Sequence, residues 1–296
     1  MRVKLEDVCE RGSSNIKQSD IIKMSGNYPI YGASGLAGKV NFYHQEQPYV
    51  AVVKDGAGIG RTTLNPAKSS VIGTMQYLIP KKNVLPEYLF YVVSYMHLEK
   101  YYTGATIPHI YFKDYKNEEF NLDNIEKQLE IIDVLGRCKK VIEARKQELV
   151  ELDSLTKARF VEMFGDPRSN PFGFEKKRLK DTCKVITGNT PSRAIEEYYG
   201  DYIEWIKTDN IVSGILNPTQ ATESLSEKGM NVGRTVEKDS ILMACIAGSI
   251  ASIGRVCITD RTVAFNQQIN AVVPEQYNIL FLYVLFQMSK DYLVKI

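Results

Sequence analysis

The sequence lacks the features of a membrane, secreted or metal-binding protein. No uninterrupted apolar run is long enough to span a bilayer, and the first residues, Met1–Gly12, have no apolar core like that of a signal peptide. The five cysteines lie far apart, at positions 9, 138, 183, 245 and 257, which suits neither a disulfide framework nor a zinc site. The three histidines show no metal-ligand spacing either. These absences predict a cytoplasmic protein with reduced thiols, no membrane association and no metal of its own.

Recognisable catalytic motifs are also missing. Gly32–Val40 imitates a phosphate-binding loop, but its glycine spacing is wrong and Val40 offers no hydroxyl for magnesium. Gly56–Gly60 imitates a dinucleotide fingerprint, but its third glycine comes one residue early and Arg61–Pro66 does not open a helix. The sequence contains no G-x-S-x-G or H-E-x-x-H motif, and no Asn-Pro-Pro-aromatic motif of the adenine-methyltransferase type. We therefore expect a binding protein that is not an enzyme, with no cofactor in this chain.

Length and charge permit several domains but do not identify a partner. A chain of 296 residues should form two or three domains, and 44% hydrophobic with 24% charged residues is typical of a globular protein. The net charge of +2 is too small to argue for nucleic acid. Residues 1–120 are mildly basic, with 14 Lys/Arg against 11 Asp/Glu, and the rest is balanced. A DNA partner would have to be held by local clusters and loops.

The stretch Ile125–Phe164 is predicted to form one long helix. It has no proline and a single glycine, Gly136, and Gly165–Pro167 ends it. Forty residues make a rod of roughly 60 Å, close to two turns of duplex DNA. Apolar residues recur at alternating spacings of four and three, the period of a seam for one partner helix. The seam consists of Ile131, Leu135, Cys138, Ile142, Leu149, Leu152 and Met163. A helical linker packed on its neighbours is the alternative interpretation.

Similar motifs occur in the same order before and after this helix. Leu5-x-Asp7-x-Cys9 recurs 174 residues later, and Ile59-Gly60-Arg61 recurs 194 residues later as Ile253-Gly254-Arg255. A proline, Pro80 or Pro274, follows each arginine by 19 residues. The two offsets place an insertion in the second copy, around Trp205 to Glu237. We therefore predict two α/β (α+β) domains in tandem, residues 1–120 and 166–296, separated by a spacer over 121–165. The second copy is expected to be incomplete, because counterparts of Gly104–Ile110 and of the long helix would lie beyond Ile296.

Basic residues on glycine-rich turns are the candidate DNA contacts, because Lys and Arg can reach phosphates or the edge of guanine. Residues 1–120 also hold 12 of the 18 tyrosines, which can contact sugar and phosphate or lie half-buried on strands. The candidates from this pattern are Lys39, Lys54, Arg61, Lys68 and Arg255. Arg61 and Arg255 occupy the same place in both copies, which a shared scaffold bond explains as well as DNA binding does.

Three further stretches resemble the DNA-specificity subunits of type I restriction-modification systems. They are Gly104–Ile110 with Lys113-Asp114, Thr187–Pro191 and Trp205–Ile211. The last stretch adds Lys207 to the candidate DNA contacts. This sequence departs from the family at Asn121–Gln128, where Lys127-Gln128 replaces the usual Glu-Gln and the usual prolines are absent. The second spacer helix of the family is also missing, so the seam needs a partner: a second copy, another subunit or residues absent from this chain.

The resemblance implies a division of labour. Each domain would read one half of a split DNA target in the major groove, and the helix would fix the gap. Modification subunits would methylate adenine with S-adenosylmethionine, and restriction subunits would cleave with ATP and magnesium. The alternatives are a protein-interaction scaffold that does not bind DNA and an inactive, truncated specificity subunit. A scaffold should lack salt-dependent duplex binding.

Overall fold

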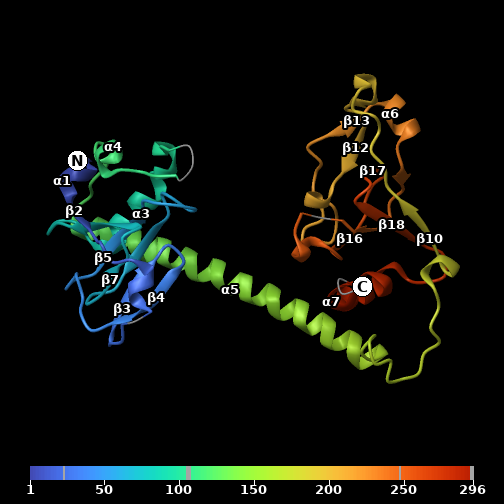
Figure 1. The fold of residues 1–296 in the computed structure, drawn as a ribbon, viewed down its shortest axis with the longest axis horizontal. Coiled ribbons are helices and arrows are strands. Elements are labelled where there is room, and N and C mark those ends of the chain that lie inside the picture. The colour runs from blue at the N-terminus through green and yellow to red at the C-terminus, as the bar shows by residue number, and fades with distance from the viewer. Residues whose placement is uncertain (23, 105–107, 247, 294–296) are drawn as a thin grey trace. The chain divides into compact units, whose positions relative to one another are not determined.

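The computed structural model describes residues 1–22, 24–104, 108–246 and 248–293, and of 291–293 the backbone alone. The chain divides into two compact units, residues 1–144 and 145–296. One continuous helix, α5 (Ile125–Phe164), runs through the boundary and has the predicted bounds (Figure 1). The other helices and strands are shorter, with 2 to 15 residues each.

The first unit contains a four-stranded sheet in the order β2-β8-β5-β6, a three-stranded sheet β4-β3-β7 and the pair β1-β9. The strands are β1 (Arg2–Lys4), β2 (Cys9–Ser13), β3 (Tyr28–Gly32), β4 (Gly35–Val40), β5 (Tyr49–Val53), β6 (Thr62–Asn65), β7 (Ser70–Val71), β8 (Met75–Pro80) and β9 (Glu119–Asn121). The helices are α1 (Leu5–Val8), α2 (Gln18–Ile21), α3 (Pro86–Tyr95), α4 (Phe112–Tyr115) and the 3₁₀-helix η1 (Leu98–Tyr101).

The second unit contains a four-stranded sheet in the order β10-β18-β15-β16 and a smaller sheet β11-β13-β12-β17-β14. The strands are β10 (Cys183–Thr187), β11 (Tyr199–Gly200), β12 (Ile203–Ile206), β13 (Ser224–Leu225), β14 (Thr235–Val236), β15 (Ile241–Ala244), β16 (Val256–Ile258), β17 (Val263–Phe265) and β18 (Ile269–Pro274). The helices are α6 (Glu227–Val232), α7 (Ile279–Leu293) and the 3₁₀-helices η2 (Leu179–Asp181), η3 (Glu196–Tyr198), η4 (Thr208–Asn210) and η5 (Ile250–Ser252). In the view of Figure 1, α7 lies below the sheet that contains β10, β16 and β18.

The two large sheets have the same topology and register, which confirms the repeat. Cys9 pairs with Pro80 in the first sheet, and Cys183 pairs with Pro274 in the second. The parallel pairing of β3 with β7 recurs as that of β12 with β17, where Trp205 takes the place of Ile30. The difference in residue number between equivalent positions of the two domains is therefore still near 174 at β12 and is 194 at β17. Most of the insertion thus follows Ile206.

The central strands are buried on both faces, and each separates two cores. Val50 and Val52 of β5 face a core that includes α3, whereas Tyr49, Ala51 and Val53 face a core shared with β3, β4 and β7. β15 is used in the same way, because Ile241 packs with α7 while Leu242 and Ala244 pack toward β12 and β17. An apolar run with no polar alternation is the expected sequence of such a strand.

The apolar spacing of residues 85–102 is that of one amphipathic helix, but the structure interrupts it. α3 ends at Tyr95, and His97 adopts a left-handed conformation with φ +52° before η1 begins at Leu98. Leu98 is fully buried, so the break turns its side chain back into the core. No proline or glycine marks this position, which is why the sequence pattern did not reveal it.

Candidate nucleic-acid interface

Both domains present the same glycine–arginine turn, between β5 and β6 in the first domain and between β15 and β16 in the second. In the first, Val53 N–H donates to the Arg61 carbonyl (2.9 Å) and Gly60 N–H donates to the Val53 carbonyl (2.9 Å). In the second, Ala244 N–H donates to the Arg255 carbonyl (2.9 Å) and Gly254 N–H donates to the Ala244 carbonyl (2.8 Å). Both glycines have positive φ, +80° and +75°, a conformation that side chains disfavour. The matched Gly-Arg pairs thus occupy equivalent places.

The two arginine side chains differ in what they bind. Arg61 is exposed, and its Nη1 donates to the Ala33 carbonyl (3.0 Å), which ties this turn to the one between β3 and β4. Arg255 is half-buried, and its Nε is a buried donor without a hydrogen-bond partner in the described part of the chain. A scaffold bond is therefore present at Arg61 and absent from the contacts described for Arg255.

The remaining predicted cations lie in different settings. Lys54 is half-buried, 3.9 Å from Asp55 at the start of the turn that ends at Arg61. Lys39 is exposed on β4, and Lys68 lies 3.9 Å from Glu46 with φ +53°. Lys207 forms an ion pair with Glu223. The structure thus brings Lys54 and Arg61 onto one turn, while Lys39 lies on the smaller sheet and Lys68 shortly before its strand β7.

The described end of the motif Gly104–Ile110, residues 108–110, lies against the glycine-rich turn of the first domain. Gly56 N–H donates to the Pro108 carbonyl (2.9 Å), and Ile110 N–H donates to the Lys54 carbonyl (2.9 Å). The Nδ1 atom of His109 lies 2.6 Å from Oδ1 of Asp55. Residues 105–107 of the motif lie outside the described residues. The described part of this motif therefore supports the turn that carries Arg61.

The motifs Thr187–Pro191 and Trp205–Ile211 of the second domain each contain an asparagine that connects neighbouring loops. The Asn189 side chain donates to the Val232 carbonyl (2.9 Å) and accepts from Arg234 N–H (2.8 Å). Asn210 is buried, and its side chain accepts from Lys207 N–H (3.0 Å) and donates to the Gln220 carbonyl (3.1 Å). These asparagines hold the segments before and after β12 in place.

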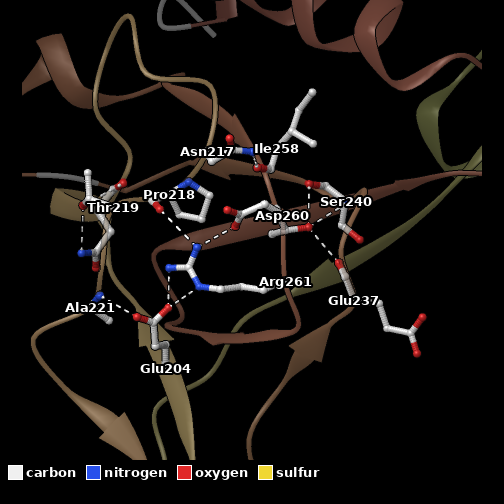
Figure 2. Close-up of polar contacts among 12 residues, drawn as sticks. Glu204, Asn217, Pro218, Thr219, Ala221, Glu237, Ser240, Ile258, Asp260 and Arg261 are labelled. Carbon is white, nitrogen blue, oxygen red and sulfur yellow. Dashed lines mark hydrogen bonds and ion pairs between the residues drawn. The ribbon is translucent and has the colours of Figure 1, made fainter.

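Arg261 attaches the inserted segment to the sheet (Figure 2). Its Nε donates to Glu204 (2.6 Å), and its Nη1 donates to Asp260 (2.6 Å) and approaches the Pro218 carbonyl (3.5 Å). Nearby, the Asn217 side chain donates to the Ile258 carbonyl (2.8 Å). The insertion is thus an ordered part of the domain, fixed by side chains that no short motif predicted.

Sequence reasoning also missed a charged and aromatic group beside β12, which we call the Arg193 cluster: Arg193, Tyr199, Trp205, Lys207 and Glu223. Arg193 donates to Glu223 (2.6 Å), and its guanidinium carbon lies 4.4 Å from the Tyr199 ring centroid. Hydrogen bonds from Lys207 and then Arg193 hold the pKa of Glu223 below its ordinary value. The only signal in the sequence was Lys207, two residues after Trp205.

The predicted helix seam is largely exposed. Ile131 instead packs against the core of the first unit. The other six residues, Leu135, Cys138, Ile142, Leu149, Leu152 and Met163, are exposed, and we call them the α5 stripe. Beside the stripe, Val134 and Val141 add exposed apolar surface on the same helix. Phe160, which the seam omitted, is buried and stacks on Phe281 with ring centroids 5.6 Å apart.

Neither a metal site nor a membrane span is found among the residues that the structure describes. No group of three or more His, Cys, Asp or Glu side chains there could hold a metal ion. None of the helices in the described ranges has both the length and the apolar character to cross a bilayer. The candidate interface therefore consists of the glycine–arginine turns, the loops beside them and the exposed face of α5.

Two copies of one α+β domain, each presenting the same glycine–arginine turn and joined through a long helix, define a protein with two equivalent binding domains. The family model described as the type I restriction modification DNA specificity domain matches residues 1–153 and 171–296. The chain therefore belongs to this family, with two recognition domains in tandem, and the predicted fold class is confirmed. The family is one of non-catalytic specificity subunits.

Two similar proteins are named as specificity subunits of type I restriction enzymes. The type I restriction enzyme HindI specificity subunit of Haemophilus influenzae is 35% identical over 117 residues, which are 38% of this chain and 24% of that protein. The MjaIX specificity subunit of Methanocaldococcus jannaschii is 28% identical over 158 residues, 47% of this chain and 36% of that protein. The matches thus span about a quarter to a third of these relatives.

A solved structure shares the fold. The S subunit of a type I restriction-modification system from M. genitalium is similar over 100% of this chain and 78% of its own, with a TM-score of 0.58 and 14% identity.

Proposed function

We propose that this chain is the DNA-specificity component of a type I restriction-modification complex. Each domain reads one half of a split duplex target, and α5 sets the gap between the halves. The observation that carries this proposal is the duplication: one sheet, one glycine–arginine turn and one register occur twice in a single chain. Two equivalent binding domains on one helical connector suit a target with two separated parts.

The chain itself contributes binding and no bond chemistry. In the proposed complex, modification subunits methylate adenine with S-adenosylmethionine, and restriction subunits cleave DNA with ATP and magnesium in the cytoplasm. The α5 stripe supports a helical partner, because exposed apolar residues at heptad spacing are stabilised by burial against another helix. We propose that a second copy of this chain covers the stripe when no other subunit does.

The proposal is tested by mapping methylated adenines. The chain is expressed with its neighbouring modification subunit in cells that lack other adenine methylation, and the modified sites are sequenced across the genome. The expected result is a two-part motif with a fixed gap. The matched control omits this chain and keeps the modification subunit.

Two results would oppose the proposal. If the modification subunit is present and active yet no motif is methylated, the specificity role is wrong. If the purified chain binds duplex DNA with no dependence on salt, or not at all, a protein-interaction scaffold is the better description.

A further inference from the structure

Arg193 is held in a fixed plane by three neighbours in the Arg193 cluster. Its guanidinium carbon lies 4.4 Å from the ring centroid of Tyr199 and 5.2 Å from that of Trp205. Its Nη2 donates to Glu223 at 2.6 Å, while Lys207 pairs with the other oxygen of that carboxylate. Stacking on aromatic faces and a charged hydrogen bond both restrict a guanidinium that would otherwise rotate freely.

The arrangement leaves donors available. Arg193 uses one of the two N–H groups of Nη2 for Glu223, while Nε, Nη1 and the other N–H of Nη2 make no hydrogen bond within the described part of the chain, and the side chain is 57% exposed. Two cations and one carboxylate give the cluster a net charge of +1. The second N–H of Nη2 and the N–H of a neighbouring nitrogen lie on one edge of the fixed guanidinium, so they can donate side by side to a planar pair of acceptors outside the protein.

The cluster belongs to the second domain alone. The shared register puts Trp205 in the place of Ile30 and Lys207 in the place of Gly32, and Glu223 lies in the insertion. Features that occur in both domains, such as the glycine–arginine turns, cannot make the two domains prefer different sequences. A feature present in one domain can.

We propose that Arg193 is a specificity-determining residue of the second domain, and that it reads a guanine through its O6 and N7 acceptors in the major groove. This inference rests on the proposed function. Bidentate contact from arginine is the common way to recognise that base edge, and it requires a guanidinium in a defined plane. A phosphate contact needs no fixed plane and carries no sequence preference, whereas the guanine edge presents two acceptors in one plane.

The test is selection of duplexes from a random library by the full chain with its modification subunit, followed by sequencing. The variants are Arg193→Ala and Arg193→Lys, of which the second keeps the charge but loses the bidentate geometry. The control is Arg178→Ala, which removes an exposed positive charge from the same domain. Because the Arg193 side chain is largely exposed, both variants should fold, and circular dichroism checks this.

The expected result is loss of guanine preference at one position of one half-site by roughly 5- to 150-fold in both Arg193 variants, with the other half-site and the gap unchanged. Arg178→Ala should keep the whole motif. An unchanged motif with uniformly weaker binding would make Arg193 a phosphate contact. That result would overturn this inference and leave the proposed function standing. A wild-type chain that selects no motif would overturn the proposed function and this inference with it.

Discussion

Gln128 fixes the start of α5 through three backbone groups. It is fully buried, accepts from Leu85 N–H (2.9 Å), and donates to the carbonyls of Asn83 (2.9 Å) and Asp123 (2.8 Å). Gln128→Ala should lower the free energy of unfolding by about 3 kcal/mol or more, because each buried polar group left without a partner costs about 1–3 kcal/mol. Urea unfolding measures this. Gln147→Ala, on the exposed part of the same helix, should change stability by less than about 0.5 kcal/mol. Equal effects would contradict the anchoring role.

The two turn glycines should respond differently to alanine. Both have positive φ, which costs a residue with a side chain about 1–2 kcal/mol. A Cβ at Gly60 would lie 2.5 Å from the backbone nitrogen of Glu99, whereas at Gly254 its nearest neighbour is Cγ of the flexible Lys290 at 3.1 Å. Gly60→Ala should therefore destabilise by about 1–3 kcal/mol more than Gly254→Ala in urea unfolding. The reverse order would show that the turns are not packed as described.

Glu118 should make the first domain sensitive to acid. It accepts from Lys100 and from the Tyr101 hydroxyl, each at 2.5 Å, and these hydrogen bonds lower the pKa of Glu118 below its ordinary value and raise the pKa of Tyr101 to about 12. A carboxyl whose pKa is lowered by folding stabilises the fold above its unfolded pKa and loses that contribution as the pH falls through its folded pKa. Glu118→Gln should thus be less stable than wild type at pH 7, with the difference shrinking below about pH 4.5. Thermal unfolding across pH measures this, with the exposed neighbour Glu119→Gln as the control for loss of charge. A difference that does not vary with pH would refute the assignment.

Sequence position predicted where some key residues lie but not what they contact. The equivalence of Arg61 and Arg255 followed from a short motif at a constant offset, and the structure bears it out. Two of the three hydrogen bonds of Gln128 reach back more than 40 residues, and Arg193 meets Glu223 across 30. Such contacts depend on how loops fold back, which local patterns do not encode. The roles of the six predicted DNA contacts stay predictions.

At the level of elements, the exposed middle of α5 is stabilised by ion pairs between its own side chains. Ion pairs one turn apart recur along it, including Arg137 with Asp133 (2.9 Å), Arg145 with Glu148 (2.5 Å) and Lys157 with Asp153 (2.6 Å). Pairs of this kind support an exposed helix by a few tenths of a kcal/mol each. The α5 stripe is left free to bind.

Charging the α5 stripe should prevent association without unfolding the chain. In the double variant Ile142→Lys with Leu149→Lys, both replaced side chains are exposed, at 56% and 67%, so little stability is lost in a single copy. Light scattering should show a dimer for the wild type and a monomer for the variant. Arg145→Lys, between the two positions, is the control. A wild-type monomer, or a variant that still dimerises, would rule out the stripe as the contact between copies.

Elements with a strong period were predictable, and short ones were not. The bounds of α5 followed from forty residues of helix formers with a proline stop, and the site of the insertion from two offsets. Two-residue strands such as β7 and β13 carry no period, and they exist because neighbouring strands pair with them. The break at His97 exists because Leu98 must reach the core.

For the whole molecule, the length of α5 should set the gap in the DNA target. Deleting residues 139–145 shortens the helix by about 10 Å, roughly three base pairs, and rotates the second domain about the helix axis by only about 20°. The methylated motif should keep both half-sites and lose about three base pairs of gap. Deleting residues 139–143 instead produces a rotation of about 140° and should abolish methylation. Altered half-site sequences, or an unchanged gap, would refute the ruler.

The shared register of the two sheets has a consequence for how such a protein can change over generations. The paired strands and glycine–arginine turns that recur in both domains maintain the fold. The insertion has no counterpart in the first domain, and the Arg193 cluster uses side chains that differ between equivalent positions. If each domain reads one half of the target, as we propose, mutations that accumulate there alter one half while the other half is inherited unchanged. A duplicated segment can thus diverge in its loops and give rise to new targets without a new fold.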